Sequence, residues 1–130
     1  MFIIDLLEND DFLYRFMGSA IDQHLGASLT GRTFSDYRSG RVLQILMQFF
    51  LKVVKQPQMG ILITQLDSET HEWVVYTRAA LPIADDHQTP NKVIGLLLMQ
   101  QSPDALLPAQ KLLLAEKEQD GLVKSYYGTL

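Results

Sequence analysis

Three arginines lie close together ahead of a long apolar segment, and their chemistry suits an anion. They are Arg32, Arg38 and Arg41, with Tyr37 among them. Guanidinium groups and the unpaired backbone amides of a helix start both bind carboxylates and phosphates. The sequence favours a second interpretation, in which these arginines form salt bridges with the acids of the first predicted hairpin.

Two further arginines occur in the middle of predicted strands, each in an apolar setting. Arg15 lies in the segment 12–17 and Arg78 in the segment 72–83. An arginine that faces a core needs an anionic partner, because an unpaired buried charge is very costly. Inside a cavity, such a side chain would anchor a ligand carboxylate. The interpretation that carries more weight places each on the open face of a sheet.

Several aromatic and apolar residues are expected to gather between a sheet and the longest helix. Core packing explains them first, but a ligand pocket would use the same surface, since small-molecule sites are mostly apolar with a few polar groups. The candidate ligand-binding residues, with the polar candidates included, are Tyr14, Phe16, Arg32, Tyr37, Met47, Phe50, Trp73, Tyr76 and Arg78.

Catalytic and metal-binding patterns are lacking in the sequence. The chain has no cysteine, and the three histidines, His24, His71 and His87, are scattered. Clustered ligands for a metal, a phosphate-binding loop and a serine nucleophile elbow are all missing. We therefore expect a protein that is not an enzyme. A cone-shaped α+β isomerase or dehydratase is an alternative, with Asp5, Asp22 or His24 as its base.

Bulk properties narrow the partners. The chain has 130 residues and a formal net charge of −4, which fits one domain. Nucleic acids and anionic membranes attract basic surfaces, so neither is an expected partner. We find no apolar run of 18 residues and no secretory signal at the start, and expect a cytoplasmic protein.

Hydrophobic periodicity predicts an α+β fold with an antiparallel sheet. Apolar residues at spacings of three and four predict a long helix over 41–55, ended by Gln56 and Pro57. Gly26 and Gly31 are expected at positive φ, where a side chain is strained. The elements are expected in this order: a hairpin of strands 2–7 and 12–17, short helices near 20–25 and 36–38, the long helix, and strands 60–66, 72–83 and 93–99.

Two stretches of the sequence resemble PAS domains. Residues 14–21 read Y-R-F-M-G-S-A-I and residues 26–32 read G-A-S-L-T-G-R. This is similar to a bacterial PAS subfamily with Y-R-F-x-G-x-x-I followed by G-x-x-L-T-G-R. The similarity is specific over residues 12–34, architectural over 41–99, and does not extend past Gln101. It implies a five-stranded antiparallel sheet with helices on one face.

The PAS resemblance also bears on function. Such domains bind small molecules between the sheet and the helices, or mediate protein contacts and dimers. Haem-binding members take a histidine from the long helix, which has none here, and a cysteinyl-flavin adduct needs a cysteine. The resemblance thus implies a sensory or regulatory module for an unidentified small molecule or regulatory protein, with neither of those cofactors.

The C-terminal part changes character at Ser102, Pro103 and Asp104, a typical helix start. We expect a PAS-like domain over 1–101 and a helical extension over 102–130. The extension is rich in leucine, and these side chains would cover the open sheet face or pair with a second subunit. A homodimer is therefore expected, and a purely structural dimerisation or adaptor domain remains an alternative function.

Overall fold

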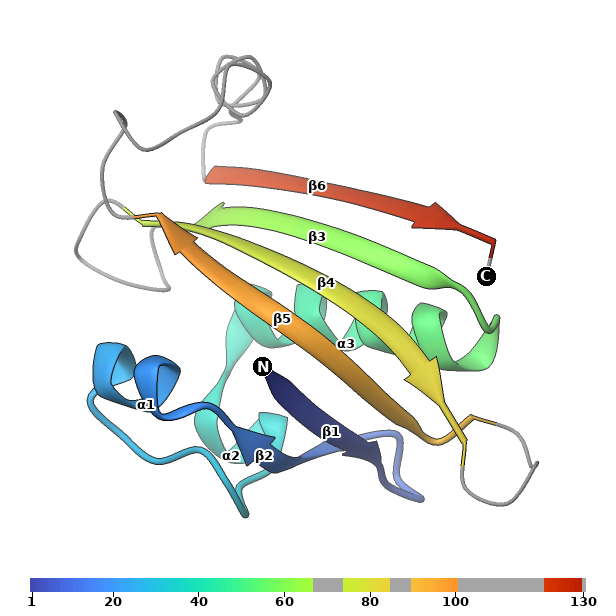
Figure 1. The fold of residues 1–130 in the computed structure, drawn as a ribbon, viewed down its shortest axis with the longest axis horizontal. Helices are drawn as coiled ribbons and strands as arrows, with labels where there is room; N and C mark the ends of the chain where they lie inside the picture. Colours follow the sequence, from blue (N-terminus) through green and yellow to red (C-terminus); the bar gives the residue numbers. More distant parts are fainter. Residues whose placement is uncertain (67–73, 85–89, 101–120, 130) are drawn as a thin grey trace.

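The protein has an α+β fold in which one open antiparallel sheet of six strands carries helices on one face (Figure 1). The computed structural model describes residues 1–66, 74–84, 90–100 and 121–129. The elements are β1 (Phe2–Leu6), β2 (Phe12–Met17), α1 (Ser19–Leu25), α2 (Phe34–Tyr37), α3 (Gly40–Lys55), β3 (Met59–Leu66), β4 (Val75–Ile83), β5 (Lys92–Gln100) and β6 (Gly121–Gly128).

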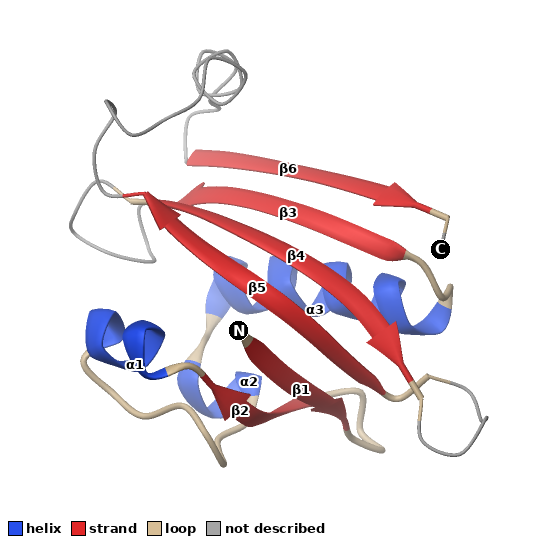
Figure 2. Cartoon of the chain, in the orientation of Figure 1, coloured by secondary structure: helices blue, strands red, loops and turns tan. Residues whose placement is uncertain are grey.

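The sheet brings the two ends of the domain together. Its strand order is β2-β1-β5-β4-β3-β6, so β1 pairs with β5 although almost the whole domain separates them in sequence. Every pairing between the described strands is antiparallel. Helix α3 lies across β3, β4 and β5 (Figure 2). We call the face that α3 covers the inner face and the opposite one the outer face.

The long helix was predicted almost to the residue. Helix α3 runs from Gly40 to Lys55, and its buried residues recur at the predicted spacings of three and four. Phe49 comes very close to the sheet, since a Cβ placed on Gly60 would lie 2.8 Å from its ring. Glycine at that position lets the helix approach β3 closely. The resulting core is aromatic, with Phe2, Phe12, Phe34, Phe49 and Phe50 in mutual ring contacts.

The glycines expected at positive φ between β2 and α3 occur where the chain turns. Gly26 ends α1 at φ 72°, and Gly31 has φ 88°. The short helices begin earlier than expected, with Gly18 at the N-cap of α1 and Thr33 at the N-cap of α2. The Thr33 hydroxyl accepts a hydrogen bond from the Asp36 amide, and the Asp36 carboxylate accepts one from the Thr33 amide.

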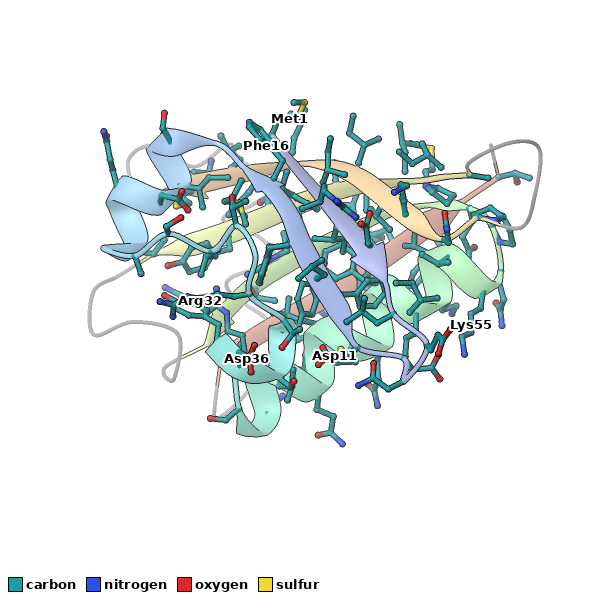
Figure 3. All side chains as sticks on the ribbon, turned by 90° about the horizontal axis from the view of Figure 1, so that it is seen from below. Met1, Asp11, Phe16, Arg32, Asp36 and Lys55 are labelled. Atoms are coloured by element: carbon teal, nitrogen blue, oxygen red, sulfur yellow. The ribbon has the colours of Figure 1, made fainter. Side chains whose placement is uncertain are left out.

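A β-bulge interrupts the alternation of strand β2. In strict alternation Phe12, Tyr14 and Phe16 would share one face. The register between β1 and β2 shifts between Ile3, which faces Phe16, and Ile4, which faces Tyr14. Arg15 is the extra residue, and such a bulge turns the following side chains over. Phe16 therefore lies on the outer face beside Met1, and is 43% exposed (Figure 3).

The sheet has six strands among the described residues, where five were expected, because residues 121–128 form a strand and not the end of a helical tail. Strand β6 pairs with β3 along its full length, from Gly128 opposite Met59 to Gly121 opposite Leu66. Val123, Tyr126 and Tyr127 favour a strand, and the Tyr127 ring lies 5.6 Å from that of Phe49. The helix expected from residue 102 onwards otherwise falls outside the described residues.

Within the described ranges, no helix is both long enough and apolar enough to cross a lipid bilayer.

Candidate functional site

A small cavity lies between the inner face and the helices, where β1, β2, β4 and β5 meet the segment from α1 to α3. Nine of its twelve lining residues are apolar, and the other three are Tyr14, Arg38 and Arg78. Its free volume is about 30 Å³, enough for about one or two water molecules. Among the described residues the lining includes no Asp, Glu or His, so the polar groups described there are two guanidinium groups and one phenol.

Arg78 reaches the cavity because β4 alternates. Tyr76, Arg78 and Ala80 point to the inner face, and Arg78 is only 5% exposed. Its guanidinium donates to the Thr64 hydroxyl at 2.8 Å and lies 5.3 Å from the centre of the Tyr76 ring. Across the sheet it faces Leu62 on one side and Leu97 on the other. Of the two mid-strand arginines, this one faces inward, against the interpretation given more weight above.

Arg38 enters the cavity from the opposite wall. It follows α2 directly, and its amide donates to the Phe34 carbonyl at 2.8 Å, which holds the side chain at the end of that helix. Its guanidinium lies 4.9 Å from the centre of the Tyr37 ring. Its Nε is buried and has no hydrogen-bond partner among the described residues. An unsatisfied buried donor is costly unless water or a ligand pairs with it.

Tyr14 completes the polar set. Burial raises the pKa of its hydroxyl above the ordinary value of 10.0, while the positive charges of Arg38 and Arg78 act in the opposite direction. Its phenol therefore stays protonated at neutral pH. Strand β2, which contains Tyr14, is also held on the edge that no other strand pairs with among the described residues. There the Tyr14 amide donates to the Arg32 carbonyl at 2.9 Å, and the Gly31 amide donates to the Tyr14 carbonyl at 2.8 Å.

This arrangement can bind an anion but offers little for acid–base chemistry. Two guanidinium groups supply several N–H donors, and inside an apolar wall their attraction for a carboxylate is stronger than in water. Arginine does not titrate at physiological pH, and a phenol with a raised pKa is a poor base. The site therefore suits recognition of a small carboxylate group.

The predicted site residues divide into four groups in the structure. Tyr14, Phe50 and Arg78 line the cavity. Tyr76 contacts the Arg78 guanidinium but does not itself line the cavity. Tyr37 and Met47 are partly buried against the core and do not line the cavity either. Arg32 is exposed and Phe16 lies on the outer face, both away from the cavity, and Trp73 falls outside the described residues.

Sequence reasoning placed Arg38 in the arginine cluster but chose Arg32 for the site. The signal that would have separated them is their position relative to α2. Arg32 precedes the N-cap Thr33, whereas Arg38 follows the helix, where the chain turns toward the sheet. The apolar lining residues Leu29 and Phe34 were also missed, although both are large apolar residues within the motif.

The second mid-strand arginine has a different role. Arg15 and Lys92 both form ion pairs with Asp5 on the outer side of β1, the lysine at 3.2 Å. Asp5 is therefore engaged by two cations, and Asp22 accepts from the Leu29 amide at 3.3 Å. These contacts weaken both as candidate catalytic bases, while the side chain of His24 falls outside the description. No set of three or more metal-ligating residues gathers in the described ranges.

Comparisons with protein-family models, with curated proteins and with solved structures gave no match to this chain.

Proposed function

We propose that this protein is a non-catalytic sensory or regulatory domain of the PAS type that binds a small carboxylate-bearing molecule between its sheet and its helices. One observation carries the proposal: Arg78, almost fully buried on the inner face, meets Arg38 at a single apolar cavity. The buried Nε of Arg38 supports it, because this donor has no hydrogen-bond partner among the described residues and a ligand oxygen would satisfy it.

The order of the elements supports the PAS assignment. Two strands, two short helices, one long helix and three strands follow one another as in that family. The glycines of the resembling motif, Gly26 and Gly31, adopt the positive φ that fixes the compact segment over the sheet. The sixth strand is an addition to the five expected.

Ligand binding would be coupled to movement of the segment from Gly18 to Arg38. The cavity of about 30 Å³ admits a carboxylate group, whereas typical small-molecule sites hold about 300 Å³ or more. A larger ligand must therefore displace a wall. The wall formed by α1 is the weakest one, because α1 makes few contacts with the other elements and such segments open first. A ligand would shift the population between closed and open positions of this segment.

The test is binding of the anions themselves, measured by calorimetry and thermal shift. The probes are formate, acetate, butanoate and inorganic phosphate, applied to the wild type, Arg38→Gln and Arg32→Gln. The two variants lose the same charge, but only Arg38 lines the cavity. A charged hydrogen bond contributes about 1.5–3 kcal/mol, so we expect about 10-fold to 100-fold weaker carboxylate binding for Arg38→Gln alone.

Two results would count against this function. One is the absence of saturable binding of every probe to the wild type. The other is equal weakening in both variants, which would reflect net charge and not the cavity. Near-ultraviolet circular dichroism of each variant shows whether the aromatic core stays folded.

A further inference from the structure

The outer face of the sheet carries two apolar rows that cross most of its strands. The register places Phe16, Ile3, Ile94 and Leu81 side by side in the first row. The second row consists of Leu96, Ala79, Ile61 and Tyr126. Cross-strand neighbours on one face form a continuous surface. No helix covers it in the described part of the chain (Figure 2).

This face is unusually exposed for its composition. Among the described residues, nine large apolar side chains are 37% to 62% exposed, and all nine lie here: Met1, Phe16, Met59, Ile61, Leu81, Ile83, Leu96, Leu98 and Tyr126. Leu96, at 62%, and Leu98, at 55%, project most. Monomeric proteins rarely expose an apolar patch of more than about 600 Å². Nine exposed apolar side chains of this size gathered on one face are typical of a protein–protein contact surface.

The shape of the face is complementary to itself. A hollow of about 300 Å³ lies where small residues meet, at Ala79, Gly60 and Gly95. Leu96, the most exposed of the nine side chains, also lines it. A projecting leucine beside a recess of this size allows two copies related by a twofold axis to insert that leucine into each other's hollow, as isologous contacts require.

Charges lie at the margins of this face and leave its centre apolar. At one end Asp5 is neutralised by Arg15 and Lys92. At the other end Lys124 of β6 pairs with Ile63 of β3, next to the apolar row that contains Ile61 and Tyr126. A centre depleted of charge with a polar rim is the usual anatomy of an interface.

We infer that the outer face is the contact between two copies of this chain, which pack sheet against sheet. This differs from the homodimer expected through C-terminal helices, and it does not depend on the proposed ligand. Sheets packed in this way lie about 10 Å apart with interdigitated side chains, which suits two rows of leucine and isoleucine.

The test is the molar mass of the full chain in solution, measured by sedimentation over a range of concentrations. We compare the wild type with Leu96→Glu and with Gln48→Glu, which adds the same charge at an exposed position of α3. The wild type and Gln48→Glu should dimerise, whereas Leu96→Glu should raise the dimer Kd at least about 30-fold, the loss expected at a central contact.

Leu96→Ser serves as a milder second variant in case the glutamate prevents folding, and it should weaken the dimer in the same direction. A dimer that both variants leave intact would place the contact elsewhere and overturn the inference. A wild type that stays monomeric at high concentration would also overturn it, and would mean that another part of the chain or a different protein covers the face.

Discussion

The two faces of this sheet differ in what they bury and what they expose. The inner face is covered by α3 and nonetheless contains the buried guanidinium of Arg78. The outer face presents Leu96 and Leu98 to solvent, while Val75 and Ile63 on the same face are buried. A fold made only for stability would place the exposed leucines and the buried arginine the other way round. These two exceptions are the basis of the proposed ligand site inside and the proposed dimer contact outside.

The largest expected effect comes from two phenylalanines of the same strand. Phe12 is fully buried on the inner face, between Phe34 and Phe50, while Phe16 lies beyond the bulge on the outer face. Phe12→Ala should cost about 3–5 kcal/mol of unfolding free energy. Phe16→Ala should cost about 1 kcal/mol or less in the dilute monomer. Urea unfolding measures both.

Similar losses for the two variants would break the comparison, because they would mean that the outer face is packed as tightly as the inner one. Repeating the measurement at high protein concentration sharpens it, since Phe16→Ala should then lose additional stability through the dimer.

A smaller effect on stability is expected when alanine replaces a glycine in strand β5 or strand β6. A Cβ on Gly95 would collide with the Phe2 ring on the inner face and would lie 2.5 Å from the Ala79 carbonyl oxygen, which is backbone and cannot move aside. Gly95→Ala should therefore cost about 1–3 kcal/mol, as overpacking does. On the edge strand β6, Gly128→Ala meets only Met59, at 3.6 Å, and should leave the melting temperature nearly unchanged. A tolerated Gly95→Ala would show that the inner face is looser than described.

The smallest effect concerns the pH dependence of Tyr14. Its pKa is raised in the folded state, chiefly by burial. Below the unfolded pKa of about 10 the phenol is protonated in both states and its stabilising contribution is complete. Above it the unfolded phenol ionises first, so stability falls as pH rises through the folded pKa. Tyr14→Phe should thus lose less stability than the wild type between about pH 9 and 11, in thermal unfolding. Parallel curves would place Tyr14 in a solvated setting.

The sequence predicted those parts of the fold that depend on local periodicity. The buried stripe of α3 and the order of the first eight elements followed from spacing, and Gly26 and Gly31 from their conformational freedom. Strand β6 was missed because its pairing with β3 joins distant parts of the chain. The bulge at Arg15 was missed for a similar reason: its register is defined only against β1.

Three of the candidate residues, Tyr14, Phe50 and Arg78, line the cavity. Alternation grouped Arg78 with Tyr76 on one face of its strand but did not say which face is the inner one, and the interpretation given more weight placed Arg78 on the open face. The choice between Arg32 and Arg38 depends on how the chain leaves α2, and spacing alone does not contain that information.

The central claim is that the inner cavity is an anion site, and its most direct test is the nuclear magnetic resonance signal of the arginine Nε–H groups. Acetate is titrated into uniformly ¹⁵N-labelled protein, and the Arg38 signal is assigned by its loss in Arg38→Gln. We expect the Arg38 signal to shift to saturation while that of the exposed Arg32 changes little. An Arg38 signal that does not move, or that drifts together with Arg32 without saturating, would contradict the account.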